Sequence, residues 1–241
     1  MTRLSVNLNK IALLRNSRGR DYPNLLEYAG KLIDLGVNGI TIHPRPDERH
    51  AKRQDAVDLG EMLARFEEVE FNIEGYPSEE FLQLVERVRP DQCTLVPDGE
   101  DQITSDHGWD ISGSSGILDR SLQRLQGAGI RCSLFLDPTV EQVRAAAQTG
   151  TERIELYTEE YARSHGLDTA DAVFHRYREA VRLAEKSGLG VNAGHDLDLN
   201  NLARFLEIGN ILEVSIGHAL TIECIDFGME EVVSRYLEIC A

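Results

Sequence analysis

Long apolar runs, paired cysteines and a basic surface are all missing from this sequence. No apolar run approaches the roughly 18 residues that a membrane-spanning helix needs, and the chain does not open with the basic and then apolar segments of a secretory signal. The 4 cysteines lie far apart and form no CxxC pair, a pattern typical of free thiols in a reducing compartment. We therefore expect a cytoplasmic protein that makes no contact with a membrane.

Positive charge is scarce. The chain has 25 Lys and Arg residues against 41 Asp and Glu residues, a formal net charge of -16 at pH 7, and such an excess of negative charge repels the phosphate backbone of nucleic acids. Basic residues gather only in small groups, as between Arg15 and Arg20. The composition argues against a nucleic-acid partner but is compatible with a local site for a small phosphorylated ligand.

Several common catalytic motifs are absent as well. The chain has no Walker A, HExxH or GxSxG sequence, and no GxGxxG follows its first apolar run. What recurs instead is a short run rich in Val, Ile and Leu followed by an amphipathic segment with apolar spacings of three and four residues. The predicted strands are residues 4–8, 39–43, 70–74, 92–96, 131–136, 153–157, 189–193 and 212–216.

The segments between these strands carry the start and stop signals of helices. Ser78 and Asp198 are predicted N-caps, Thr139 and Gln142 form a predicted capping box, and Pro23 precedes an apolar helix face. Strand starts 22 to 39 residues apart leave room for the crossover helices that parallel strands need. The order predicts a single (β/α)8 TIM barrel over residues 1–241, with short extra helices.

Polar residues follow nearly every predicted strand. In a barrel of this kind the carboxyl ends of the strands and the loops after them form the active site. Four of the 7 histidines fall there, together with two glutamates, and such groups supply bases and acids whose protonation can be tuned near neutral pH. The strand-end candidates are Asn7, Asn9, Lys10, His43, Arg45, His50, Glu74, Thr104, Glu155, Tyr157, Asn192, His195, Gly217 and His218.

Two places near this mouth suit an anion. Barrels often bind phosphate with the loops after strands seven and eight and the N-terminus of a short extra helix, here predicted over residues 218–225. Gly194 and Gly217 either allow the backbone to approach the anion or are simply turn residues.

Basic residues near strands one and two form a second candidate anion site. Lys10, Arg18 and Arg45 are its main candidates. Arg15 belongs to the same group in sequence, but we expect Arg15 and Arg20 to face solvent. Two anion sites in one mouth indicate either two phosphorylated substrates or one substrate with a phosphate at each end.

The sequence as a whole resembles the pyridoxine 5'-phosphate synthase family. The matching blocks, which follow one another in the family's order, are VNLNKIALLRNSRG (6–19), GITIHPRPDERH (39–50), FNIEG (71–75), CTLVPD (93–98), SLFLD (133–137), VNAGHDL (191–197) and SIGHA (215–219). The resemblance implies condensation of 1-deoxy-D-xylulose 5-phosphate with 3-amino-2-oxopropyl phosphate to pyridoxine 5'-phosphate, with release of inorganic phosphate and water. It also implies no bound cofactor or metal, and octamers built from dimers.

The resemblance assigns roles residue by residue. His43 and Glu74 match the family's bases, His195 its acid, and Glu155 the group that stabilises the transition state. The residues that match its substrate contacts are Arg45, His50 and Thr104 for the deoxyxylulose phosphate and Asn7, Arg18, Gly217 and His218 for the amino ketone phosphate. The long loop at residues 97–116 resembles a lid, whose closure would exclude water from imine intermediates.

This chain departs from the family pattern in a few places. Asn9 and Lys10 replace an Asp-His pair found in some members, and Asp196 follows His195 where others have glycine, so we treat all three as substrate-contact candidates. Tyr177 and Val181 are expected to be exposed on an outer helix and available for a subunit interface.

Two other functions fit parts of the pattern. A metal-dependent barrel isomerase or hydrolase acting on a sugar phosphate would use His43, Glu74, Glu155 and His195 as metal ligands. A barrel that has kept phosphate binding without catalysis would act as a metabolite sensor or scaffold.

Overall fold

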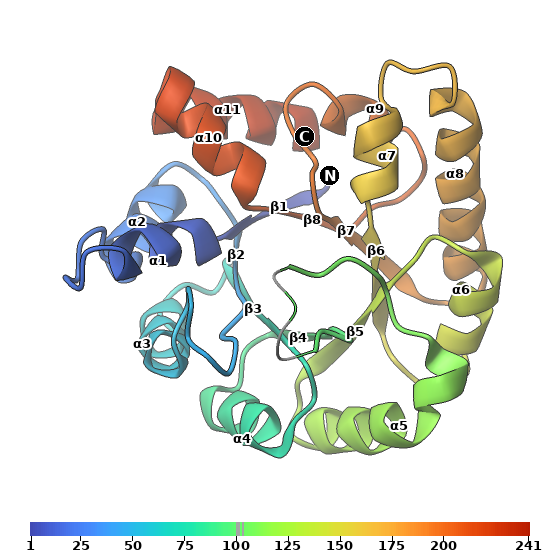
Figure 1. The fold of residues 1–241 in the computed structure, drawn as a ribbon, viewed down its shortest axis with the longest axis horizontal. Coiled ribbons are helices and arrows are strands. Elements are labelled where there is room, and N and C mark those ends of the chain that lie inside the picture. The colour runs from blue at the N-terminus through green and yellow to red at the C-terminus, as the bar shows by residue number, and fades with distance from the viewer. Residues whose placement is uncertain (100–101, 103) are drawn as a thin grey trace.

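The computed structural model describes residues 1–99, 102 and 104–241, and its strands close into one parallel barrel in chain order (Figure 1). The predicted (β/α)8 fold is therefore confirmed, and each predicted strand agrees with the structure to within one residue at either end. The strands are β1 (Arg3–Asn7), β2 (Gly39–Ile42), β3 (Glu70–Gly75), β4 (Gln92–Leu95), β5 (Arg131–Leu136), β6 (Arg153–Tyr157), β7 (Gly190–Gly194) and β8 (Glu213–Ile216).

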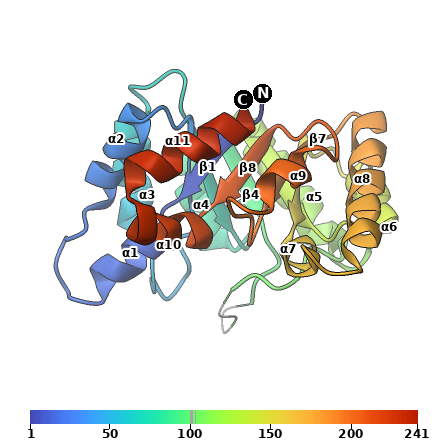
Figure 2. The same cartoon turned by 90° about the horizontal axis from the view of Figure 1, so that it is seen from above.

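Helices surround this barrel (Figure 1). The two termini lie together at the amino end of the strands, where the Thr2 N–H donates to the Cys240 carbonyl at 2.9 Å, and α7 and α10 lie toward the opposite end (Figure 2). The helices are α1 (Asn9–Asn16), α2 (Leu25–Asp34), α3 (Arg53–Leu63), α4 (Glu79–Val88), α5 (Ile111–Gly127), α6 (Val140–Ala146), α7 (Glu159–Ser164), α8 (Ala170–Lys186), α9 (Leu202–Leu206), α10 (His218–Phe227) and α11 (Met229–Cys240).

The predicted caps are only partly confirmed. Ser78 accepts a hydrogen bond from the Phe81 N–H at 3.2 Å, as expected of an N-cap. Thr139 caps α6 in the same way, but its own N–H donates to the Asp137 carbonyl at 2.7 Å and not to the Gln142 side chain, which accepts from the Ile111 N–H, so the predicted capping box is not completed. Asp198 is not the cap of α9: it organises the preceding turn, and Asn201 occupies the N-cap position.

Alternation along the strands divides the molecule into two environments. Successive strand residues point to opposite faces, and in β3 the apolar residues Phe71 and Ile73 join the hydrophobic core that lies between the barrel and its helices. The intervening polar residues point into the barrel and bond to one another across strands. Hydrogen bonds link Ser5 to Thr41 at 2.7 Å, and Thr94 to Asn72 at 3.1 Å. The barrel interior is therefore polar, unlike the branched apolar filling common in this fold.

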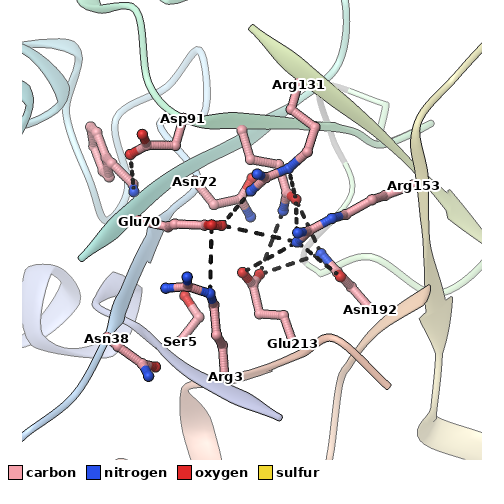
Figure 3. A network of polar contacts seen from close by, with 12 residues as sticks. Arg3, Ser5, Asn38, Glu70, Asn72, Asp91, Arg131, Arg153, Asn192 and Glu213 are labelled. Carbon is pink, nitrogen blue, oxygen red and sulfur yellow. Dashed lines mark hydrogen bonds and ion pairs between the residues drawn. The ribbon is translucent and has the colours of Figure 1, made fainter. Parts of the chain in front are cut away.

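A network of charged and amide side chains fills the amino end of the barrel interior (Figure 3). Arg131 pairs with Glu70, and Arg153 lies 3.9 Å from Glu213. The amides of Gln92 and Asn192 join the network, with Asn192 Nδ2 donating to Gln92 Oε1 at 3.2 Å. Burial raises the pKa of Glu213 to about 7 although Arg153 opposes that shift. This network lies at the end of the barrel opposite the cavity described below.

The outer face of α8 differs from the expectation. Tyr177 and Val181 are completely buried, because the i, i+3, i+4 pattern that contains them is the core-facing stripe of the helix. The Tyr177 hydroxyl donates to the Tyr157 carbonyl at 2.6 Å, directly beneath a strand end. The prediction that these two side chains serve an interface is therefore wrong.

The cysteines and the helix lengths bear on two further features of the sequence. All 4 cysteines are free thiols. None of the helices within residues 1–99, 102 and 104–241 combines the length and the hydropathy needed to cross a lipid bilayer.

Candidate active site

A cavity of about 370 Å³ opens at the carboxyl ends of the strands. Two of the strand-end candidates do not line it: Tyr157 packs against the His195 ring, and Asn192 belongs to the network at the amino end of the barrel. Among the residues predicted to act in catalysis or substrate binding, only Arg18 is absent from its walls. Those that line it are Asn7, Asn9, Lys10, His43, Arg45, His50, Glu74, Thr104, Glu155, His195, Asp196, Gly217 and His218. Residues from all eight strands or the segments after them converge here, with Phe135 contributed by β5, because parallel strands in a closed barrel all end at the same rim.

The two arginines near α1 occupy different places from those expected. Arg18 is exposed in the segment after α1 and does not reach the cavity. Arg15 is buried and forms a two-pronged ion pair with Asp55, at 2.6 and 2.8 Å, so the expectation that it faces solvent is wrong. Its guanidinium also donates to the His50 carbonyl at 3.4 Å. Arg15 therefore supports the loop that carries His50 into the cavity.

The two histidines that follow β2 favour their neutral forms. Burial lowers the pKa of His43 well below its usual range, and the nearby Arg45 lowers it further. Burial and Arg45 also lower the pKa of His50 to about 4. His50 Nδ1 accepts from the Ala51 N–H at 3.0 Å, which leaves Nε2 as the protonated nitrogen. A neutral imidazole at His43 suits a proton acceptor.

Two glutamates share the floor of the cavity. Burial and the neighbouring Glu155 raise the pKa of Glu74 well above its usual range, and burial and Glu213 raise the pKa of Glu155 to about 8. Asn7 Nδ2 donates to Glu74 at 3.4 Å, and the Thr94 hydroxyl donates to Glu155 at the same distance. Carboxyl groups in such surroundings can hold a proton near neutral pH and release it within the site.

The two glycines of the rim make room for site side chains. A Cβ atom at Gly194 would lie 2.3 Å from Glu155 Oε1, and one at Gly217 would lie 3.0 Å from the Asn7 Cβ. Neither has the positive φ of a glycine-requiring turn. Their small size thus positions Glu155 and Asn7, a role that the sequence analysis did not assign to them.

His195 occupies a left-handed backbone conformation that is uncommon outside glycine. Its φ is 85° and that of Asp196 is 58°. The Thr158 hydroxyl donates to the carbonyls of Gly194, at 2.7 Å, and of His195, while Asn201 Nδ2 donates to the Asp196 carbonyl at 3.1 Å. These bonds hold a strained turn that aims the imidazole into the cavity.

Aromatic rings flank the His195 imidazole. The ring centroids of Phe135 and Tyr157 lie 5.7 and 5.1 Å from it. Burial lowers the pKa of His195, while the charges of Asp196 and Asp98 oppose the shift. Three residues of this site were not predicted: Phe135, Thr158 and Asp98. Phe135 lies near the end of β5 and Thr158 directly follows β6, so their positions at strand ends could have suggested both.

Arg45 is fixed by the segment that follows β4. Its guanidinium pairs with Asp98 and donates to the Gln102 carbonyl at 2.9 Å. Thr104 lies on the same segment and is exposed at the cavity. The predicted lid at 97–116 includes residues 100, 101 and 103, which lie outside the described residues.

The metal-dependent alternative requires a cluster of metal-binding side chains. Within the described part of the chain, no group of three or more His, Cys, Asp or Glu side chains is placed so that it could hold a metal ion.

Comparison with known proteins identifies the family. The model of the family described as pyridoxal phosphate biosynthesis protein PdxJ matches residues 4–241. The chain belongs to the PdxJ family. PdxJ-family relatives named pyridoxine 5'-phosphate synthase are 48% identical in Porphyromonas gingivalis, over 98% of both chains, and 49% identical in Cytophaga hutchinsonii, again over 98% of both. A third, from Christiangramia forsetii, is 48% identical over 99% of both chains.

Solved structures outside the PdxJ family share the barrel. Phosphoribosyl anthranilate isomerase from Thermus thermophilus superimposes with a TM-score of 0.61 at 14% identity, covering 99% of this chain and 100% of the other. The structure titled native KDPGal gives the same TM-score at 13% identity, covering 98% and 93%. At these identities the likeness shows the fold alone.

Proposed function

We propose that this PdxJ-family chain condenses 1-deoxy-D-xylulose 5-phosphate with 3-amino-2-oxopropyl phosphate and closes the pyridine ring of pyridoxine 5'-phosphate, releasing phosphate and water. The observation that carries the proposal is the convergence of two high-pKa carboxyl groups and four histidines in one cavity. Joining an amine to a ketone and then closing an aromatic ring requires several proton transfers, and such a set supplies them.

The bases and the acid follow from their surroundings. We assign His43 and Glu74 as proton acceptors. The low pKa of His43 keeps its imidazole neutral, and the raised pKa of Glu74 makes its carboxylate, held by Asn7, a stronger base once it has released its own proton. His195 donates protons to leaving groups. Burial lowers its pKa, but the negative charges of bound phosphate groups raise the pKa of a nearby imidazole and favour the protonated donor. Glu155 stabilises charge that develops in the transition state.

The cations of the cavity receive the substrate phosphates. We assign Arg45, His50 and Thr104 to the deoxyxylulose phosphate, and Asn7, Gly217 and His218 to the amino ketone phosphate. Arg18 was predicted for the same phosphate, but its side chain does not line the cavity, so its assignment rests on the resemblance alone. Asp196, whose side chain is exposed at the rim, is assigned to the substrate amine.

Asn9 and Lys10, which depart from the family pattern, are assigned different roles. Asn9 Oδ1 accepts from the His43 N–H, and the Asn9 N–H donates to Asn7 Oδ1, both at 3.0 Å. These contacts support a positioning role for Asn9 at the base. Lys10 lines the cavity, which supports a phosphate contact for its side chain.

We propose that the chain forms octamers built from dimers in the cytoplasm and works without a bound cofactor. The neighbouring helices α1 and α10 expose Leu13, Leu14, Ile222, Ile225 and Phe227. Several large apolar side chains on two adjacent helices favour an interface between subunits. Sedimentation at micromolar concentration tests this assembly, and Ile225→Asp should shift the protein toward smaller species.

Mixing the purified protein with both substrates tests the reaction. The expected result is the ultraviolet absorbance and fluorescence of the pyridoxine ring, with one inorganic phosphate released per ring. Activity that is lost to chelators and restored by a divalent metal would support the metal-dependent alternative. Saturable binding of both phosphates without turnover would support the sensor.

A further inference from the structure

We infer that Asp98 is a positioning residue that fixes the guanidinium of Arg45 at the cavity wall. This inference rests on the proposed function, in which Arg45 receives the phosphate of deoxyxylulose 5-phosphate. Asp98 lies just beyond β4 and does not itself line the cavity, whereas Arg45 does. Asp98 therefore acts through Arg45 and not by direct contact with substrate.

The contacts of Asp98 converge on one oxygen atom. Arg45 Nη2 and the Ser105 hydroxyl both reach Asp98 Oδ2, the hydroxyl at 2.7 Å. Ser105 also lines the cavity. Asp98 Oδ1 is buried and has no hydrogen-bond partner among the described residues. A carboxylate this enclosed, with one unpaired oxygen, is costly to bury, so its presence beside Arg45 is not explained by packing alone.

Two anchors together define the plane of the Arg45 guanidinium. Nη2 pairs with Asp98, and Nη1 donates to the Gln102 carbonyl at 2.9 Å. The Arg45 and Asp98 side chains are only 4% and 2% exposed. A guanidinium presents its five N–H donors in a rigid fork, so fixing two of its nitrogens also fixes where its remaining donors point. The substrate phosphate then meets an arginine whose side chain is already ordered.

The charge of Asp98 also reaches the acid and base groups. It raises the pKa of Glu74 and of His195. Replacing it by a neutral amide should therefore lower both pKa values and shift both limbs of the activity profile to lower pH. The charged groups around Glu74 are Glu155, Asp98, Glu213 and Arg45, and those around His195 are Asp196, Asp98, Glu159 and Lys10.

The experiment compares Asp98→Asn, Asp98→Glu and Ser105→Ala with Asp119→Asn, a control at an exposed acid on α5. In steady-state assays of ring formation, Asp98→Asn should raise the KM for deoxyxylulose 5-phosphate about tenfold, with a smaller change in kcat and both pH limbs moved to lower pH. Asp98→Glu should recover most of the affinity and the wild-type profile. Ser105→Ala should raise the KM two- to threefold by our estimate, and Asp119→Asn should match the wild type.

A KM that is unchanged or lower in Asp98→Asn would overturn the inference, because a carboxylate that merely competes with phosphate for Arg45 would have that effect. If Asp98→Asn does not fold, Asp98→Glu and Ser105→Ala decide the matter through the same KM. If the wild-type protein forms no ring, the proposed function fails. Calorimetric binding of deoxyxylulose 5-phosphate then tests Asp98. Weaker or undetectable binding in Asp98→Asn, where the wild type binds, supports its role, whereas equal binding by both proteins, or no binding by the wild type, overturns it.

Discussion

Gly194→Ala should displace the Glu155 carboxylate while leaving the rest of the barrel in place. The added Cβ would lie 2.3 Å from Glu155 Oε1, whereas real Cβ contacts stay beyond 3.0 Å, and its next contact outside that side chain, the Ser215 carbonyl, is at 3.5 Å. Forcing one atom into a packed interior costs about 1–3 kcal/mol. Moving a catalytic group by a sizeable part of an ångström costs up to about 100-fold in kcat.

A double-mutant cycle isolates this contact. Free energies of unfolding from urea titration and kcat from ring formation would be measured for Gly194→Ala, Glu155→Ala and the double variant. Because Glu155→Ala removes the obstructing oxygen, Gly194→Ala should cost little in that background, with a coupling of about 1–2 kcal/mol. The control is Gly127→Ala, whose Cβ would meet nothing within 4 Å and should be neutral or slightly stabilising in both backgrounds. Equal costs of Gly194→Ala with and without Glu155 would refute the reasoning.

Three further variants test other parts of the site. His195→Asn should lower kcat by at least about 100-fold with little change in KM, because a proton donor acts in the transition state; a rise in KM alone would reassign His195 to binding. Glu155→Gln should change how stability depends on pH. The pKa of Glu155 is about 8 in the folded protein against an ordinary 4.5, so its contribution to stability is complete below about 4.5 and is lost as the pH rises through 8. Urea titrations should therefore show the variant gaining on the wild type across this window, by at most about 1.4 kcal/mol per pH unit, and a constant difference would contradict the shifted pKa. Thr158→Val removes the hydroxyl that donates to the Gly194 and His195 carbonyls; it should cost about 1 kcal/mol of stability and lower kcat more than it raises KM, and unchanged kcat would show that the turn holds its shape without Thr158.

The strands and most of the site were predictable because the same alternation of apolar and polar residues indicates both. Alternation of apolar and polar residues marks each strand, and the last polar residue of the run marks the rim, so His43, Glu74 and Glu155 were found at the cavity. The same periodicity, applied to α8, would have placed Tyr177 in the core, and its neglect there led to the wrong expectation about the interface.

Residues whose role depends on a distant partner were not predictable. Arg15 is buried because Asp55, forty positions away in the sequence, meets it across the loop that carries His50. Thr158 and Asn201 hold the His195 turn by donating to main-chain carbonyls. Every residue has such a carbonyl, so the sequence does not indicate which one a side chain will bind. The pairing of Asp98 with Arg45 likewise joins residues far apart in the sequence, and no motif around Asp98 predicts it.

The polar interior of the barrel has a consequence for how this chain tolerates change. Outward-facing residues, which pack in the hydrophobic core, alternate along each strand with inward-facing polar residues, some of which line the cavity. Substitutions at two neighbouring positions therefore affect different properties, stability at one and proton transfer at the other. A library that randomises only the inward position nearest each rim would sample new chemistry while leaving the apolar ring around the barrel intact. A library that randomises the adjacent, outward-facing positions would instead yield variants that differ mainly in whether they fold.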